Sequence, residues 1–548
     1  MLKNAFILIL AMIIFVCCSR EKEKADLIIH NAAIYTVDSS FSKKEALAVK
    51  DGRIIDIGSN DEILNRYQSA ETNDAQGKSI FPGLIDAHCH FTGYATDMWK
   101  CDLTGTTSFE EVIEKIRVYE KTAPMYWIYG RGWDQNDWSV KEFPTKEQLD
   151  LLFPDRPVFL KRVDGHAALV NQKALDLTGI TATTSVKGGS LELKNGKLTG
   201  ILIDNAMDLV DLKIPSVSDS LAKHYFGIAQ QTCFSLGLTS IHDCGISEHT
   251  VDLLKEVEKN GKLKMKVFAL LSDDPSYYDR WIKNGIYKGS RFTVGGFKIY
   301  GDGALGSRGA CLHQPYSDKP SWTGFMLTDT HRIKTIAEIL IQSPFQYCTH
   351  AIGDSANSYM LRAYAKALKG KNNKRWRIEH AQVLDSSLFH FFGDFNIIPS
   401  VQPTHATSDM YWAGDRVGTK RLKFAYAYKR LLEQNGFIAL GTDFPVESIS
   451  PIKTFYAAVE RKDAKGFPEN GFQKENALSR EEALRGMTIW ASYAAFEETE
   501  KGSLEKGKAA DFIIVDTDLM TCKPEDILKT KVIATYSNGE KVFGNTQP

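Results

Sequence analysis

The stretch Phe81-Pro-Gly-Leu-Ile-Asp-Ala-His-Cys-His90 is the part of the chain that decides its fold class. Its apolar residues lead into His88 and His90, which is typical of a buried strand. Residues two apart on a strand point to the same side, so the strand presents two imidazoles to one point. Such a pair suits zinc or a similar divalent metal, although two polar residues can also simply end a strand.

Later apolar runs repeat this pattern, each followed by a loop and a helical stretch. The predicted strands end near His90, Asp243, Leu271, Lys298, His350, His380, Gln402 and Asp443. Helices are expected at 251–259, 331–342, 356–369 and 428–434. Eight strand–helix units predict an α/β fold, a (β/α)8 barrel of the TIM type, whose chemistry lies at the carboxyl ends of its strands.

Both ends of the chain are rich in short apolar runs separated by turn residues. Asp51-Gly52 and Asn538-Gly539 are the hairpin signals of the two ends. We therefore expect residues 26–79 and 503–548 to form one small β-sandwich domain and residues 80–502 to form the barrel.

The regular spacing breaks between about residues 92 and 236, which is too long for one strand–helix unit. We interpret this region as an insertion after barrel strand 1, with helices at 109–119 and 218–232. Insertions over a barrel mouth commonly shape the substrate pocket.

Length and charge exclude one class of function. The chain has 548 residues, which fits a barrel with an insertion plus one smaller domain. Lys+Arg number 67 against 68 Asp+Glu, for a net charge of −1. Without a basic excess to neutralise phosphates, no nucleic-acid partner is expected. The sequence does not decide between a monomer and a homo-oligomer.

The first twenty residues indicate export. An apolar run from Ala5 to Val16 follows an early lysine and is shorter than the roughly 20 residues of a membrane span. The run ends at Cys17-Cys18 and resembles a bacterial lipoprotein signal. This resemblance implies a signal peptide over 1–18, lipidation of Cys18 or less favourably Cys17, a tether over 19–25 and anchoring in the membrane of the cell envelope. A plain cleaved signal or a short anchor is the alternative.

The remaining seven cysteines show no CxxC spacing, and most lie in apolar runs as small buried residues. We expect no zinc site made of cysteine.

Ionisable side chains gather at the predicted strand ends, from which they would converge on one barrel mouth. They are His88 and His90 on the first strand, Lys298 on the fourth, His350 on the fifth, His380 on the sixth and Asp443 on the eighth. A lone histidine at a strand end is more often structural, but this joint placement predicts a functional centre.

On these residues the sequence resembles the metal-dependent amidohydrolase superfamily, and within it the branch of N-substituted formamide deformylases. Four further motifs carry the resemblance: Arg162-Val-Asp-Gly-His166, Asp302-Gly-Ala-Leu-Gly-Ser307, His350-Ala-Ile-Gly-Asp354 and Arg377-Ile-Glu-His380. The resemblance implies that His88 and His90 bind the more buried metal and that His350 and His380 bind a second. It also implies that Asp443 binds the first metal and shuttles protons.

The resemblance further implies a hydrolase of carbon–nitrogen bonds other than peptide bonds, acting on small amides or N-formyl and N-acyl compounds. One or two divalent ions, with zinc expected, would lower the pKa of water from about 15.7 toward 7 and give an attacking hydroxide. Asp443 would accept the proton and pass it to the leaving nitrogen. The alternatives are hydrolysis of a cyclic amide or another acyl derivative, and a surface lipoprotein that binds a metal or ligand without turnover.

Lys298 matches the position where many family members carry a carboxylated lysine that bridges two metals. Beside two cations and partly buried, its pKa should fall, and carbon dioxide could then convert the free amine to a carbamate. A neutral or ion-paired lysine in a one-metal site is the alternative.

Four residues are candidates for substrate binding: Asp164, His166, Trp133 and Arg308. His166 could instead reach the second metal or be ordinary insertion structure. Trp133 is better explained as core, and Arg308 as part of an internal salt bridge.

Two further strand-end sites have less defined expectations. We expect His242-Asp243 to pack beneath the centre, and His405, after Gln402-Pro403, to reach the barrel mouth.

Overall fold

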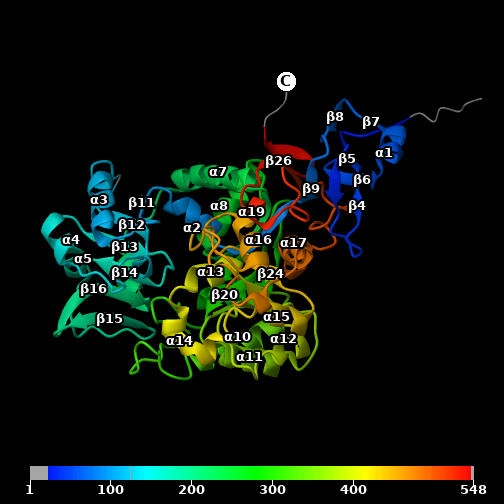
Figure 1. The fold of residues 1–548 in the computed structure, drawn as a ribbon. Coiled ribbons are helices and arrows are strands. Elements are labelled where there is room, and N and C mark those ends of the chain that lie inside the picture. Colours follow the sequence, from blue (N-terminus) through cyan, green and yellow to red (C-terminus); the bar gives the residue numbers. More distant parts are fainter. Residues whose placement is uncertain (1–21, 124, 545–548) are drawn as a thin grey trace, which may run out of the picture.

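The structure is a computed structural model that describes residues 22–123 and 125–544 (Figure 1). The expected signal peptide and the lipidation sites Cys17 and Cys18 lie outside the described residues. Among the helices of the described part, none is long and apolar enough to cross a membrane.

Eight parallel strands form the centre of the molecule, and each hydrogen-bonds to the next in chain order. They are β10 (Leu84–Cys89), β17 (Leu238–Ile246), β18 (Lys266–Ser272), β20 (Phe292–Tyr300), β21 (Gln346–Ala351), β22 (Arg377–His380), β23 (Ile398–Val401) and β24 (Ala439–Leu440). A short strand, β19 (Tyr287–Lys288), adds antiparallel to β20. The predicted barrel is confirmed.

The barrel closes through the loop that follows its short last strand. Asp443 N donates to His88 O (2.7 Å), and His90 N donates to Phe444 O (2.8 Å). Gly441 permits this approach, because a Cβ there would lie 2.5 Å from His88 N. The first and last strand ends, which are over 350 residues apart in sequence, therefore lie side by side.

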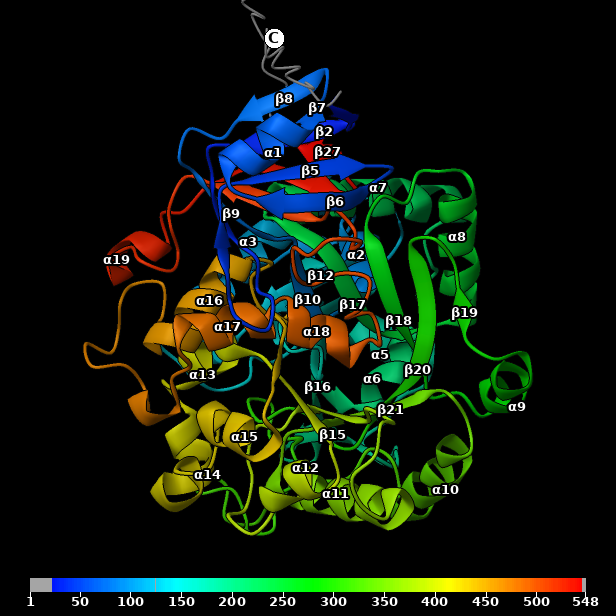
Figure 2. The same ribbon diagram turned by 90° about the vertical axis from the view of Figure 1, so that its right-hand side faces the viewer.

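Helices surround the strands (Figure 2). They are α7 (Asp219–Ser235), α8 (Glu248–Lys259), α9 (Pro275–Asn284), α10 (Thr330–Ile341), α11 (Asp354–Leu368), α12 (His390–Asp394), α13 (Pro403–Asp409), α14 (Ala413–Leu422), α15 (Tyr428–Asn435), α16 (Pro451–Glu460), α17 (Arg480–Gly486) and α18 (Ile489–Ala494). The expected helices at 251–259, 331–342, 356–369 and 428–434 are α8, α10, α11 and α15.

The expected insertion is a separate sheet that follows β10 and the short α2 (Phe91–Asp97) (Figure 1). Its strands pair in the order β11 (Cys101–Asp102), β12 (Ile128–Trp133), β13 (Val158–Arg162), β14 (Ala167–Val170), β16 (Lys197–Asp204) and β15 (Gly189–Lys194). Its helices are α3 (Phe109–Glu120), α4 (Glu147–Leu152), α5 (Gln172–Thr178) and α6 (Asn205–Asp211). Two apolar clusters, one containing Leu160 and the other Phe159, give the sheet a core on each face.

The two chain ends build a β-sandwich, as expected. One sheet is β6 (Arg53–Gly58), β5 (Ala46–Lys50), β2 (Leu27–His30) and β8 (Glu71–Asp74). The other is β27 (Glu540–Phe543), β26 (Val532–Ser537), β25 (Phe512–Val515), β9 (Ser79–Pro82), β3 (Ala33–Tyr35) and β4 (Lys43–Lys44). Leu47 of the first sheet and Phe512 of the second belong to one buried cluster. The short helix α1 (Asn60–Arg66) packs against this domain, whereas α19 (Pro524–Ile527) packs against the barrel helix α16.

The tether expected over 19–25 is too long. Glu23 and Lys24 form strand β1, which pairs in parallel with β7 (Tyr67–Gln68). Backbone pairing of these two residues therefore begins the β domain before residue 26, while β9 runs across the expected domain boundary at 79/80.

A buried ion pair joins the barrel to the sandwich. Lys266 Nζ of β18 donates to Asp511 Oδ2, which directly precedes β25, and the two side chains are 11% and 4% exposed. Burial alone would raise the pKa of Asp511, but the Lys266 ammonium holds it below its usual value. Removing one partner of a buried pair typically costs about 3–5 kcal/mol, because the other charge is left uncompensated.

We expect Asp511→Asn to lower the free energy of unfolding by about 3 kcal/mol in denaturant titrations near neutral pH. Since folding lowers the pKa of Asp511, its stabilisation is complete above the unfolded value of about 3.9 and is lost as the pH falls. The difference from the parent should therefore narrow below about pH 4. Asp252→Asn on α8, where the carboxylate is 76% exposed, is the matched control. A loss no larger than that of the control would refute this role of the pair.

Candidate metal centre

His88, His90 and Asp443 converge at the carboxyl end of the barrel. Asp443 Oδ1 lies 3.4 Å from His88 Nε2 and 3.2 Å from His90 Nε2. One ligand atom from each residue lies within 4.8 Å of the other two. His88 and Asp443 are buried, whereas the side chain of His90 is 26% exposed and borders the opening. Three strand-end residues selected from the sequence thus share one small space.

These separations fit a divalent cation. A tetrahedral zinc ion with ligands at about 2.0–2.1 Å holds them roughly 3.3–3.4 Å apart. Asp443 Oδ1 is buried and has no hydrogen-bond partner among the described residues, which is costly for a carboxylate unless a cation satisfies it. The backbone of Asp443 also has φ of +64°, an uncommon conformation for a non-glycine residue that its hydrogen bond to His88 O holds in place.

Charge favours the same interpretation. Burial alone would raise the pKa of Asp443, but the rings of His90, His88 and His405 hold it well below its usual range, so the group is a carboxylate. Burial lowers the pKa of His88, His350 and His380, and neighbouring cationic groups lower it further. Neutral imidazoles and an ionised carboxylate are the forms that bind metals.

Glu379 orients His88. Glu379 Oε2 lies 2.6 Å from His88 Nδ1, and both side chains are fully buried. The other carboxylate oxygen of Glu379 lies 2.7 Å from Arg377 Nε. A carboxylate accepts the Nδ1 proton and leaves the Nε2 lone pair directed toward Asp443, as in carboxylate–histidine–metal arrangements. Glu379 was not among the predicted site residues.

A second group contains His380, His405 and Asp443, whose ligand atoms also lie within 4.8 Å of one another. His405, near the start of α13, places its Nε2 3.5 Å from Asp443 Oδ2. His380 Nδ1 lies 2.8 Å from Gln402 Oε1. His405 therefore reaches the barrel mouth, as expected. It also forms a cluster of possible metal ligands with His380, which the sequence did not indicate.

His350 borders this second group without belonging to it. Its ring centre is 4.5 Å from that of His380, so the two predicted ligands of the second metal are neighbours. However, among the described residues, no cluster of three possible metal ligands includes His350. Its Nε2 lies 3.4 Å from Gly303 O.

Lys298 reaches the centre in a charged form. Its Nζ lies 3.4 Å from His88 Nε2, and the side chain is buried. Burial lowers the pKa of Lys298, but Tyr300, Cys244, Glu379 and Asp443 together raise it above its usual value. The chain by itself thus keeps the ammonium, and the shift expected beside two cations stays a prediction.

Cys244 forms a third group with His88 and Glu379. Burial raises the pKa of its thiol well above the usual value, so the thiolate that zinc requires is disfavoured. The carboxylate of Glu379 is also already engaged by His88 and Arg377.

Two predicted substrate-binding residues are occupied elsewhere. Trp133 is 1% exposed, lies in the insertion core and donates from Nε1 to Leu160 O (2.8 Å), so the prediction that it lines the pocket is wrong. Arg308 forms an ion pair with Asp318 (2.9 Å). Trp133 is therefore a core residue and Arg308 part of an internal salt bridge, the alternatives that the sequence also offered.

The other candidates divide between the mouth and the barrel interior. Asp164 pairs with Arg162, and His166 lies with its ring centre 5.1 Å from that of His350. His242 Nδ1 lies 3.1 Å from Arg377 Nη1, and Asp243 accepts from Thr92 N (3.0 Å), so this dipeptide supports the strand ends as expected.

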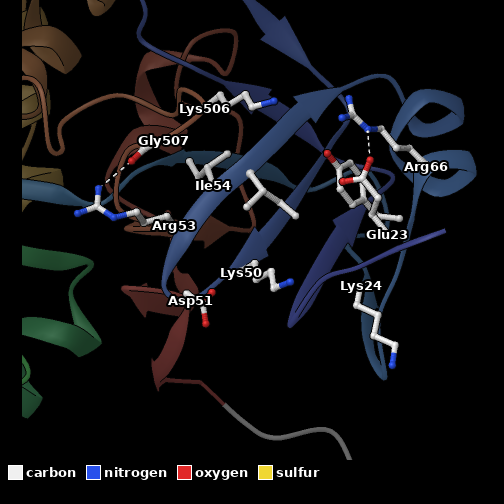
Figure 3. A pocket seen from close by; sticks show the side chains of 11 residues that line it. Glu23, Lys24, Lys50, Asp51, Arg53, Ile54, Arg66, Lys506 and Gly507 are labelled. Carbon is white, nitrogen blue, oxygen red and sulfur yellow. Dashed lines mark hydrogen bonds and ion pairs between the residues drawn. The ribbon is translucent and has the colours of Figure 1, made fainter.

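A surface hollow of about 650 Å³ lies on the terminal β domain (Figure 3). It is lined by cationic side chains, two of which are engaged: Arg66 pairs with Glu23, and Arg53 donates to Gly507 O (2.7 Å). None of the residues that line it belongs to the histidine centre. The barrel mouth therefore remains the candidate active site.

Comparison with known proteins identifies the chain's family. The sequence model described as the amidohydrolase family matches residues 71–543. The chain belongs to the amidohydrolase family. This amidohydrolase is 27% identical over 541 residues to N-substituted formamide deformylase of Arthrobacter pascens, covering 94% of this chain and 97% of that protein.

Two further matches extend over nearly the whole amidohydrolase. It is 32% identical over 539 residues to Protein LONG AFTER FAR-RED 3 of Arabidopsis thaliana, covering 95% of this chain and 92% of that protein. An uncharacterized metal-dependent hydrolase of Pyrococcus furiosus aligns with a TM-score of 0.70 and 30% identity, covering 91% and 100% of the two chains. The resemblance and the fold class are confirmed, and the protein is an enzyme that hydrolyses carbon–nitrogen bonds of small molecules.

Proposed function

We propose that this amidohydrolase is a metal-dependent hydrolase of small amides other than peptides, with N-formyl and N-acyl amines as its substrate class. The observation that carries the proposal is the buried Asp443 Oδ1, which has no hydrogen-bond partner among the described residues and lies between the Nε2 atoms of His88 and His90. The similarity to a formamide deformylase over nearly the whole chain supports the choice of N-formyl compounds.

The proposed chemistry divides between a divalent ion and the chain. A bound ion, for which we propose zinc, would polarise the substrate carbonyl and acidify water. His88, His90 and Asp443 would hold it, and His380 with His350 or His405 would hold a second ion if two are present. Lys298 as a carboxylated bridge between two ions is part of the same proposal.

Asp443 is the proposed proton shuttle. Its carboxylate is ionised and enclosed by His88, His90 and His405, so it can take a proton from the attacking water. It then gives this proton to the leaving nitrogen, which departs as a neutral amine. Burial of the carboxylate strengthens these interactions by excluding bulk water.

One experiment tests the proposed function. Purified protein would be analysed for bound metals and assayed with a matched set of N-formyl amines, N-acetyl amines and cyclic amides. We expect about one or two equivalents of a divalent metal, loss of activity on chelation and preference for open-chain N-acyl amines. Metal without hydrolysis of any amide would favour a binding lipoprotein, and preference for cyclic amides would replace the proposed substrate class.

Export and anchoring through Cys18 remain a proposal that rests on the sequence. Cys18→Ser should abolish incorporation of labelled fatty acid and release the protein from membranes, whereas Cys17→Ser should not. The opposite result would assign the anchor to Cys17, and no incorporation in either parent or variant would favour a plain cleaved signal.

A further inference from the structure

We infer that His166, supplied by the insertion and positioned by Asp204, accepts a hydrogen bond from the substrate's amide N–H and so selects secondary over tertiary amides. This inference rests on the proposed function and adds a specificity determinant to it. Both residues belong to the insertion, and the barrel surrounds them with Gly303, Gly309 and His350.

His166 brings the insertion to the barrel mouth. It lies in the turn between β13 and β14, and its ring centre is 5.1 Å from that of His350 and 6.3 Å from that of Tyr300. The side chain is 14% exposed, which leaves it accessible to a small molecule while most of the ring is enclosed. His166 therefore borders the same opening as the predicted metal ligands.

Asp204 holds His166 at two points, one on the ring and one on the backbone. Asp204 Oδ1 lies 2.6 Å from His166 Nδ1, and Asp204 N donates to His166 O (3.0 Å). Asp164 Oδ1 also accepts from His166 N (3.0 Å), so the turn itself is fixed. Such a set of contacts gives the imidazole one orientation before any substrate arrives.

The barrel is shaped to receive Asp204. Its side chain is fully buried against the loop after β20, where a Cβ on Gly303 or Gly309 would come within 2.6 or 2.4 Å of Oδ2. The backbone of Asp204 has φ of +50°, an uncommon conformation for a non-glycine residue. Two glycines and a strained backbone thus accommodate one carboxylate, whose structural partner is His166.

The hydrogen-bond chemistry indicates what His166 does. Burial alone would lower the pKa of His166, but Asp204 raises it above its usual value. In the neutral ring, which prevails above this pKa, the Nδ1 proton is donated to Asp204 and Nε2 carries a lone pair, to which no described residue donates. Among the described residues, His166 is in no cluster of three possible metal ligands, so the geometry favours contact with substrate over metal binding. A secondary amide offers one N–H to such an acceptor, and an N-methylated amide offers none.

A pair of substrates tests this inference: an N-formyl derivative of a primary amine and its N-methyl analogue. We expect the parent enzyme to prefer the secondary amide in kcat/KM. His166→Ala should reduce this preference by about 10–100-fold, as expected for one buried hydrogen bond. The loss should fall mainly on the secondary amide, and the metal content should stay that of the parent.

Asp204→Asn tests positioning separately. Asparagine keeps an oxygen that accepts from His166 Nδ1, so it should retain more of the preference than Asp204→Ala. His249→Ala, on a ring that is 67% exposed, is the control. An unchanged preference in His166→Ala, or loss of metal from it, would overturn the inference. No hydrolysis of either amide by the parent would instead refute the proposed function.

Discussion

Replacement of Asp443 by asparagine is expected to reduce kcat/KM for amide hydrolysis by about 10³-fold. Asparagine keeps the volume of the side chain but cannot accept a proton, and general acid–base catalysis typically contributes 10²–10⁴-fold. Asp443 is also the one carboxylate that contacts both His88 and His90 in the first group. Initial rates on an N-formyl amine would give the effect, and calorimetry with a slowly hydrolysed amide would report whether binding survives.

The matched control for this variant is Asp394→Asn on α12, where the carboxylate is 63% exposed and pairs with His390. This control should retain the parent's rate. Hydrolysis that persists unchanged in Asp443→Asn would remove Asp443 from the proton-transfer role. Equal ligand binding in both proteins with no turnover in the parent would support a binding protein.

Glu379→Gln is expected to weaken metal binding by about 10–100-fold, the usual cost of losing the partner that orients a histidine ligand. The amide is similar in shape, but it removes the negative charge 2.6 Å from His88 Nδ1 and leaves Arg377 without its carboxylate. Competition with a chromophoric chelator would measure the affinity, and thermal melts would report the accompanying loss of stability.

Glu256→Gln, on a side chain that is 52% exposed, serves as the control for Glu379→Gln. An affinity equal to that of the parent in a folded Glu379→Gln protein would show that His88 needs no carboxylate to bind its ion. Reduced stability with unchanged affinity would assign Glu379 to the core alone.

The strand ends were predictable because their signals are local. His88 and His90 stand two apart after an apolar run, and the runs ending at His350 and His380 carry the same signal. Asp443 was harder, since β24 has only two residues and Asp443 lies in the loop beyond it. Its position depends on a hydrogen bond to His88 of the first strand. Closure of the predicted barrel implied that the first and last strand ends meet.

Residues that act through long-range packing were not predictable in the same way. Glu379 carried a usable signal: with Arg377 it forms an alternating charged pair on a buried strand, which favours an inward ion pair. Asp204 carried none, because its contact with His166 comes from the pairing of β14 with β16, and the sequence does not give the register of that pairing.

Trp133 shows the same limit of sequence reasoning. Whether Trp133 faces a pocket or a core depends on which face of the insertion sheet is covered, and two-residue alternation does not decide it. For Lys298, the sequence likewise did not indicate that Tyr300, Cys244 and Glu379 surround its amine and raise its pKa in the chain without a metal.

The most direct test of the metal centre is an anomalous difference map at the zinc absorption edge, from crystals of protein purified without chelators and supplied with zinc. We predict a peak within about 2.0–2.3 Å of His88 Nε2, His90 Nε2 and Asp443 Oδ1. Fully occupied zinc at another site, with no peak among these three atoms, would contradict the account.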